Sequence, residues 1–286
     1  MADKRAAACG DVNGEENMTE TATKEASKET AMTAPLCDAQ AARPALVIKY
    51  CRGRLGGSAF LLSLIQRARA GGRKVVVIDG DEASRTVREH YPSGPDAALV
   101  PAGTEIADFK QLMLEQLERM VDDRISRVVD ISGGSRDLDE VLIDLDLSTF
   151  CEDNGIDLIA VAVLGAFAED LNHVVKAIDA GFLKPSNLLL VLNRGVLGKL
   201  NPDVAFVPIM DDPRFIALIA AGATLITMPN LPVLGKMMEA HADVYHVAAT
   251  ARWDGKPQPI WHNMSKRFVA QIEQEYDHKG VLERLP

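Results

Sequence analysis

The segment from residue 45 to residue 79 constrains the fold more than any other part of the chain. Residues 45–50, Ala-Leu-Val-Ile-Lys-Tyr, form a short apolar run with the β-branched content of a strand. A glycine-containing loop follows, and residues 58–70 place apolar side chains at helical spacing. Residues 74–79 are nearly all apolar, as in a second buried strand. Strand, loop, helix and strand in this order form a βαβ unit, which predicts parallel strands covered by helices on both faces.

Apolar runs alternate with segments of helical periodicity through the rest of the chain. Further strands are predicted at residues 127–131, 156–164, 187–193, 204–208 and 223–227. Further helices are predicted at residues 104–121, 136–151, 169–180, 231–242 and 264–276. This order predicts an α/β fold in which a mostly parallel sheet is sandwiched by helices, as a single domain spanning residues 44–286.

Residues 1–43 differ in composition from the rest of the chain. They are rich in Ala, Thr, Glu and Lys, and they hold eight acidic and five basic side chains but almost no large apolar residue. Such a segment buries too little surface to offset its conformational entropy, so we expect a disordered acidic tail. Two roles remain open for this tail: an inert solubilising extension, or an arm that binds a partner.

Charge and hydropathy argue against several classes of protein. The formal net charge of −10 disfavours a protein that coats nucleic acid through bulk positive charge, although a local basic patch remains open. No apolar run reaches the ~18 residues of a membrane span, and the polar N-terminus has no apolar core of a secretory signal. The four cysteines lack C-x-x-C spacing, which favours reduced thiols in the cytoplasm over disulfides or a zinc site.

The residues between the first strand and the first helix, Cys-Arg-Gly-Arg-Leu-Gly-Gly-Ser-Ala at 51–59, stand where phosphate-binding loops lie. Backbone N–H groups at a helix N-terminus converge there on an anion. A working P-loop reads G-x-x-x-x-G-K-S/T, in which the lysine reaches the β- and γ-phosphates and the hydroxyl binds Mg²⁺. The loop of this chain resembles that of the ParA/MinD family of deviant-Walker ATPases, which reads K-G-G-x-G-K-S/T-T.

This resemblance implies a cofactor-binding role for six loop residues, namely Arg52, Gly53, Arg54, Gly56, Gly57 and Ser58. Arg52 takes the position of the family's signature lysine, and Arg54 replaces its second glycine. Ser58 matches the hydroxyl that binds Mg²⁺. Gly57 stands where the invariant P-loop lysine is expected, so the loop departs from the pattern at the residue that contacts the transferred phosphate.

Three later segments resemble the same family in order and spacing. The segment ending in Ile-Asp-Gly-Asp is similar to a strand end that implies a catalytic, water-positioning role for Asp81, with Asp79 before it. A Walker B-like strand implies that Asp130, with Ser58, lies at the Mg²⁺, and a later strand implies that Asn193 contacts the base. These carboxylates stand at predicted carboxyl ends of parallel strands, the edge where ligands bind. An ordinary polar strand end is the alternative interpretation.

The resemblance implies ATP and Mg²⁺ as cofactors and a protein that dimerises or docks a protein partner, with DNA contacted through a complex. A further likeness, to ParA-like proteins of plasmid mobilisation and stability, implies plasmid partition, mobilisation or conjugative transfer. Because Gly57 replaces the lysine, the first hypothesis is a binding protein with weak or no ATPase activity. Two alternatives remain open: a slow ATPase in which Arg52 replaces the lysine, and an α/β protein that binds a non-nucleotide anion or metabolite.

Overall fold

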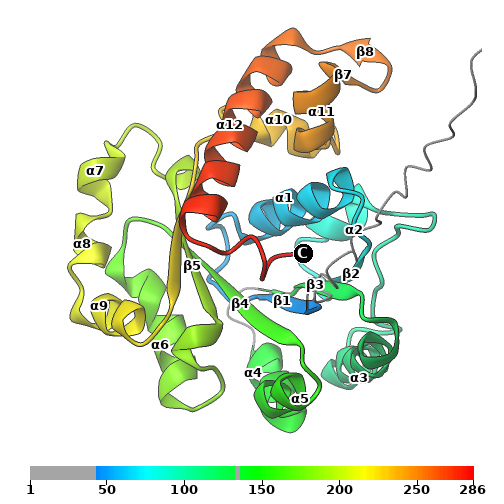
Figure 1. Ribbon diagram of the computed structural model, residues 1–286, viewed down its shortest axis with the longest axis vertical. Coiled ribbons are helices and arrows are strands. Elements are labelled where there is room, and N and C mark those ends of the chain that lie inside the picture. Colours follow the sequence, from blue (N-terminus) through cyan, green and yellow to red (C-terminus); the bar gives the residue numbers. More distant parts are fainter. Residues whose placement is uncertain (1–42, 133–135) are drawn as a thin grey trace, which may run out of the picture. The chain divides into compact units, whose positions relative to one another are not determined.

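A computed structural model describes residues 43–132 and 136–286 of the chain (Figure 1). The tail expected at residues 1–43 therefore lies outside the described residues, except for residue 43. Within the described ranges, no helix is both long enough and apolar enough to cross a membrane.

The centre of the fold is a six-stranded sheet in which all neighbouring strands are parallel, in the order β2-β3-β1-β4-β5-β6. Its strands are β1 (Ala45–Lys49), β2 (Val75–Asp79), β3 (Ser126–Asp130), β4 (Asp157–Leu164), β5 (Leu188–Asn193) and β6 (Thr224–Met228). A separate hairpin pairs β7 (Arg252–Trp253) with β8 (Lys256–Pro257). Every residue of β1 and β5 is buried, as expected for strands covered on both faces.

Twelve α-helices are assigned in the described ranges. They are α1 (Gly57–Ala70), α2 (Thr86–His90), α3 (Ile106–Asp123), α4 (Arg136–Asp144), α5 (Leu147–Asp153), α6 (Leu171–Asp179), α7 (Pro202–Ala205), α8 (Val207–Met210), α9 (Pro213–Ala220), α10 (Leu234–Glu239), α11 (Val244–Thr250) and α12 (Pro259–His278). Short 3₁₀ turns lie at Ala168–Asp170, Pro185–Asn187 and Arg194–Val196.

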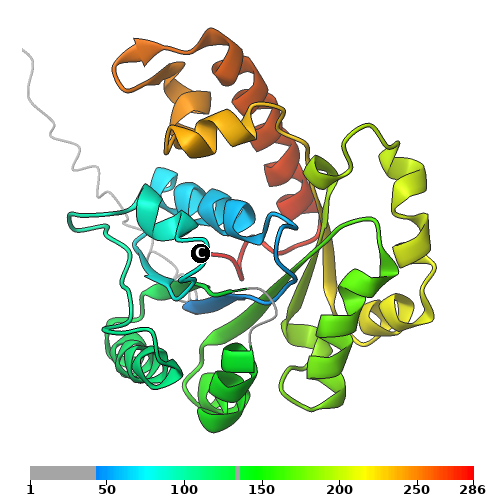
Figure 2. The same cartoon turned by 180° about the vertical axis from the view of Figure 1, so that it is seen from behind.

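The helices cover both faces of the sheet. Helices α1 and α10–α12 lie on one face, and α3–α6 lie on the other, as the two opposite views in Figures 1 and 2 show. Two apolar cores result, one beneath each helical layer. Side chains of β1 alternate between them: Ala45 and Val47 join the core under α1, whereas Leu46 and Ile48 join the other. The predicted fold class, a parallel sheet sandwiched by helices, is confirmed.

The predicted strand at residues 204–208 is wrong, because this segment contributes to two short helices, α7 and α8. The Asn201 side chain accepts a hydrogen bond from the backbone N–H of Asp203 and so caps α7, and Pro202 occupies its first turn. Pro208 similarly stands in the first turn of α8. Local capping therefore overrides the β-branched content of the segment.

The predicted helix at residues 136–151 is divided into α4 and α5. The division falls before Asp146, whose backbone has a left-handed φ of 39° and whose side chain accepts a hydrogen bond from the N–H of Thr149.

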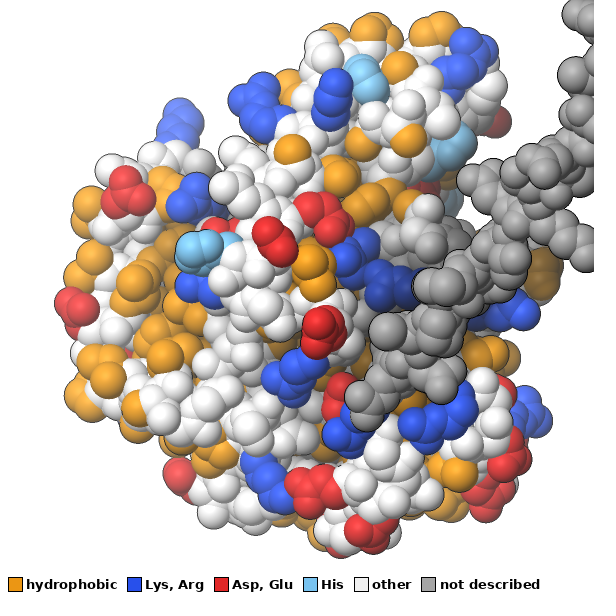
Figure 3. All heavy atoms as spheres, viewed as in Figure 1, with side chains coloured by type: hydrophobic (Ala, Val, Ile, Leu, Met, Phe, Trp, Pro, Cys, Tyr) orange, Lys and Arg blue, Asp and Glu red, His pale blue; other side chains and the backbone are white. Residues whose placement is uncertain are grey.

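Exposed apolar side chains gather beyond the edge of the sheet, over α7, α8 and α9 (Figure 3). They include Val204, Val207, Met210 and Ile216.

Candidate functional site

The glycine loop joins the carboxyl end of β1 to the first turn of α1. Its geometry requires glycine at position 56, where φ is 87° and an added Cβ would lie 2.5 Å from Nδ2 of Asn193. No side chain caps the N-terminus of α1, and its first turn holds no acidic residue. The positive end of the helix dipole therefore faces the loop without a protein carboxylate in that turn.

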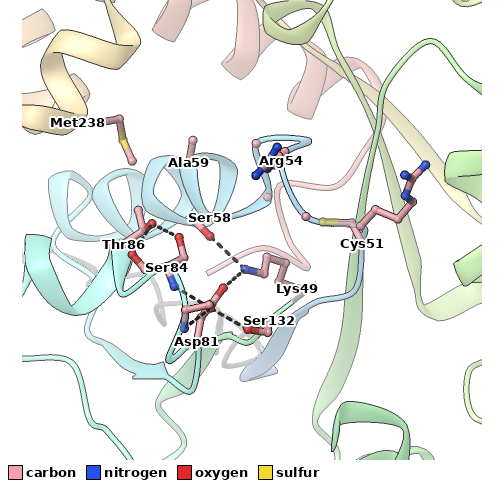
Figure 4. Close-up of a pocket in the computed structure, with 15 residues that line it drawn as sticks. Lys49, Cys51, Arg54, Ser58, Ala59, Asp81, Ser84, Thr86, Ser132 and Met238 are labelled. Carbon is pink, nitrogen blue, oxygen red and sulfur yellow. Dashed lines mark hydrogen bonds and ion pairs between the residues drawn. The ribbon is translucent and has the colours of Figure 1, made fainter. Parts of the chain in front are cut away.

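Lys49, the last residue of β1, enters the site beneath this loop. The alternation along the strand places Lys49 on the same face as Ala45 and Val47, the face covered by α1. Its side chain is only 6% exposed. Its ammonium donates hydrogen bonds to Oγ of Ser58 (3.0 Å) and to Oδ2 of Asp81 (3.2 Å), as Figure 4 shows. The ammonium also forms an ion pair with Asp130.

Gly57 leaves the space through which the Lys49 side chain passes. A Cβ at position 57 would lie 2.7 Å from Cδ of Lys49 and 2.7 Å from Sγ of Cys51. The position at which the family resemblance expects a lysine is thus occupied by glycine, and the stem of a lysine from the preceding strand fills the adjacent volume. The site therefore contains a buried lysine that the loop motif does not reveal.

Asp81 is held from several sides. Its Oδ1 accepts hydrogen bonds from Oγ of Ser132 (2.7 Å) and from the backbone N–H groups of Ala83 (3.2 Å) and Ser84 (3.0 Å). Burial alone would raise the pKa of Asp81, but the Ser132 hydroxyl, Lys49 and the Ser84 N–H outweigh it and lower the pKa below the ordinary value. Asp81 is therefore a carboxylate at neutral pH.

The charge state of Lys49 follows from the same contacts. Burial alone would lower the pKa of its ammonium, but Asp130 and Asp81 outweigh this and raise the pKa above the ordinary value. Asp130 itself is completely buried, at 0% exposure, beneath the lysine. Lys49 is thus a fixed cation between two buried carboxyl groups.

Asp79 and Asn193 support the loops around the site. Asp79 accepts hydrogen bonds from the backbone N–H groups of Asp81 (2.9 Å) and Arg88 (2.7 Å), which fixes the segment after β2. Asn193 donates from Nδ2 to the carbonyl of Leu55 (2.8 Å), and its Oδ1 accepts from the N–H of Gly195 (2.8 Å). The Asn193 amide therefore holds the glycine loop from behind.

The two loop arginines lie at the rim. Nη1 of Arg52 lies 3.0 Å from Oδ1 of Asp170, so this guanidinium is paired, although it is 56% exposed. Arg54 has a left-handed φ of 67° and an exposed side chain. Among residues 43–132 and 136–286, Arg54 has no ion-pair or side-chain hydrogen-bond partner. Arg54 is consequently the rim cation that is available to a ligand.

These residues surround a cavity of about 580 Å³. Most of the residues predicted from the sequence line it, namely Arg52, Gly53, Arg54, Gly56, Gly57, Ser58 and Asp81. Asp130 lies below Lys49, and Asn193 lies behind the loop, so neither is part of the lining. The lining also includes residues that were not among the predicted ones, such as Lys49, Ser84, Thr86, Ser132 and Met238.

The oxygen donors of this site can be compared with the needs of Mg²⁺. Ser58, Asp81 and Asp130 offer the hydroxyl and carboxylate oxygens that Mg²⁺ prefers. All three, however, contact the Lys49 ammonium. Within the part of the chain that the structure describes, no cluster of three or more His, Cys, Asp or Glu side chains is arranged to hold a metal ion. In this arrangement the residues do not fit a divalent cation.

No protein-family model matches the sequence, and no curated protein matches it. Among solved structures, MinD cell division protein from Aquifex aeolicus is 13% identical, with a TM-score of 0.42, over 79% of this chain and 97% of that chain. A putative plasmid partition protein from Borrelia burgdorferi B31, bound to AMPPNP, is 11% identical, with a TM-score of 0.45, over 80% and 100%.

Chloroplast FtsY from Physcomitrella patens is 13% identical, with a TM-score of 0.42, over 70% of this chain. The match spans 65% of the FtsY chain, which is less than two thirds of it. Similarity at this level identifies neither a family nor an activity. The class defined by the structure is an α/β protein with a parallel sheet and a glycine loop at the N-terminus of its first helix.

Proposed function

We propose that the chain binds a nucleotide, or another phosphate-bearing ligand, at the loop of residues 51–59. The observation that carries this proposal is the uncapped N-terminus of α1. This helix end, Arg54 and Lys49 line the same cavity. Backbone N–H groups at a helix N-terminus and a free guanidinium are the groups that bind phosphate oxygens. The cavity volume of about 580 Å³ also lies in the ordinary range of small-molecule sites.

We propose further that the chain works through binding, with little or no phosphoryl transfer. Catalysis of that reaction depends on cations that stabilise charge on the transferred group. The Lys49 ammonium is engaged by Ser58, Asp81 and Asp130. Arg52, the residue that could replace a catalytic lysine, is paired with Asp170. Both cations would have to leave protein partners to act on a phosphoryl group.

We assign the consequence of binding to dimerisation or to docking of a protein partner. The apolar side chains exposed on α7–α9, which include Val204, Met210 and Ile216, offer a surface of the kind used for such contacts. The resemblance of the sequence to ParA/MinD proteins favours a role in plasmid partition, mobilisation or conjugative transfer, with DNA contacted through the partner complex. ATP is the first ligand to test.

Isothermal titration of the full chain with ATP, ADP and GTP tests the binding step. We expect dissociation constants in the micromolar to millimolar range for at least one nucleotide. Arg54→Ala should weaken that affinity by about tenfold, the typical effect of losing a hydrogen bond to a charged group. Arg119→Ala removes an exposed arginine of α3, on the other face of the sheet, and should leave the affinity unchanged.

Three outcomes separate the hypotheses. Binding of pyrophosphate but of no nucleotide favours the non-nucleotide anion. Nucleotide turnover that Arg52→Ala abolishes favours the slow ATPase. The proposal fails if no nucleotide or pyrophosphate binds at millimolar concentration, or if Arg54→Ala binds as tightly as the unaltered chain.

A further inference from the structure

We infer that the ammonium of Lys49 occupies the position of a divalent cation in this site, so that a phosphate-bearing ligand binds without Mg²⁺. The first half of the inference rests on the arrangement of the described residues. The second half rests on the proposed function. The two halves are therefore tested by different measurements.

The contacts of the ammonium carry the first half. A lysine ammonium has three N–H donors and no acceptor. Here it faces three oxygen groups from three elements: Oγ of Ser58 on α1 at 3.0 Å, Oδ2 of Asp81 after β2 at 3.2 Å, and the Asp130 carboxylate at the end of β3. A hydroxyl and two carboxylates are also the donor types of a Mg²⁺ site. The number of donors matches the number of oxygen groups, so one internal cation contacts all three, and the second oxygen of Asp130 has no hydrogen-bond partner among the described residues.

Packing keeps the ammonium in this place. The Lys49 stem runs where a Cβ at position 57 would come within 2.7 Å of Cδ and 3.0 Å of Cγ. The glycine at this position therefore admits the stem, and any larger residue would displace it. The second oxygen of Asp81 is separately held by the Ser132 hydroxyl and by backbone N–H groups. The carboxylate has no oxygen free to turn toward another cation.

Electrostatics then disfavours a second cation. The ammonium already offsets one of the two negative charges of the cluster. A divalent ion placed among the same oxygens would lie within a few ångströms of the ammonium, at a depth where repulsion is weakly screened. Metal binding thus requires Lys49 to leave, and that would strand its charge in the core.

The consequence concerns how the ligand is neutralised. In a site that uses Mg²⁺, the metal offsets part of the phosphate charge. In this chain the available positive charge comes from Arg54 and from the helix N-terminus. Affinity for ATP is therefore expected to be the same in Mg²⁺ and in EDTA, within about twofold.

A titration of Mn²⁺ into the full chain without nucleotide tests whether Lys49 takes the place of the cation. The electron paramagnetic resonance signal of free Mn²⁺ measures how much of the ion is bound. The unaltered chain should show only weak binding that Asp130→Asn does not change. Lys49→Met frees the three oxygen groups, and we expect one new site, roughly tenfold or more above that background. Lys110→Met is the matched control, because Lys110 also stands between two carboxylates, Glu140 and Asp144, but at the surface.

Lys49→Met leaves two buried carboxylates unpaired, so a second measurement covers the case in which it folds poorly. Millimolar Mn²⁺ should then raise its melting temperature, while the double variant Lys49→Met/Asp130→Asn should show no such rise. A stoichiometric Mn²⁺ site in the unaltered chain that Asp130→Asn removes would overturn the inference. So would a Lys49→Met chain that neither binds Mn²⁺ above background nor gains stability from it.

The claim that the ligand binds without Mg²⁺ is tested by the affinity for ATP. A tenfold or larger increase in ATP affinity on adding Mg²⁺ to the unaltered chain would show that the metal enters with the ligand. If no phosphate ligand binds at all, the proposed function fails. The Mn²⁺ measurements still decide whether Lys49 takes the place of the cation.

Discussion

Two lysines of this molecule stand between two carboxylates, and they differ mainly in their access to water. Lys49 is 6% exposed, and its partners Asp81 and Asp130 are 6% and 0% exposed. Lys110 is 22% exposed, and its partners Glu140 and Asp144 are each 54% exposed. Each cluster places one ammonium between two acidic side chains, so their main difference is burial.

The clusters also differ in what they connect. Lys110 links α3 to α4 across the surface. The Lys49 ammonium links the ends of three neighbouring strands, β1, β2 and β3, to the first turn of α1. Water can replace any partner lost from the exposed cluster, whereas nothing replaces a partner lost from the buried one. The buried cluster is therefore part of the framework that shapes the glycine loop.

The largest expected effect is the difference in stability between two variants, each of which lacks one of these lysines. Lys49→Met leaves two carboxylates buried without a counter-ion, and we expect the free energy of unfolding to fall by about 3–5 kcal/mol. Lys110→Met leaves carboxylates that water solvates, and we expect no measurable change. Urea unfolding of both variants beside the unaltered chain gives the comparison directly. Equal losses in the two variants would mean that burial does not distinguish the clusters.

The same contrast explains which parts of the site could be predicted from the sequence. Asp79, Asp81 and Asp130 follow apolar runs, and parallel strands place such ends at one edge. Their grouping was therefore accessible from the pattern alone. The period-2 alternation that places Ala45 and Val47 under α1 also places Lys49 there, and this signal was present in the sequence. This signal is weak on its own, because a lysine at a strand end is usually solvated.

Other features depend on contacts between distant residues. Arg52 pairs with Asp170, 118 positions away, and Asn193 holds the carbonyl of Leu55, 138 positions away. No local spacing indicates either contact. In the segment at 204–208 a local pattern is misleading instead. Its β-branched residues predict a strand, but the cap at Asn201 and the proline at position 202 favour helices. The strands of the sheet can be predicted from periodicity. The contacts of the site residues can be identified only once the fold is known.

A smaller effect is expected from a change that moves Lys49 without altering any charge. Gly57→Ala places a methyl group 2.7 Å from Cδ of Lys49 and from Sγ of Cys51, and such overpacking typically costs about 1–3 kcal/mol. Gly53→Ala is the matched control in the same loop, because an added Cβ there meets nothing within 4 Å. Thermal unfolding of the two variants measures the difference. Similar melting temperatures would show that the Lys49 stem is free to shift.

The smallest effect concerns how the two clusters respond to acid. The pKa of Asp81 is below its ordinary value, because the Ser132 hydroxyl, Lys49 and the Ser84 N–H outweigh the effect of burial. A carboxyl with a lowered folded-state pKa adds stability above the unfolded-state pKa, near 3.8, and loses it as the pH falls through the folded-state pKa. Lys49, whose pKa is raised, keeps its contribution until the pH rises through its folded-state pKa, which lies above 10.5. At neutral pH both contributions are complete.

Asp81→Asn should therefore be less stable than the unaltered chain at pH 7, and the difference should narrow as the pH falls below 3.8. Asp144→Asn is the counterpart in the exposed cluster, and its effect should be small throughout because water screens that pair. Urea unfolding at a series of pH values from neutral to acid measures both curves. A stability difference for Asp81→Asn that stays constant through the acid range would mean that Asp81 acts in the folded chain through its shape and hydrogen bonds, and that its charge beside Lys49 adds nothing. In that case the buried cluster would owe its rigidity to packing around the lysine stem.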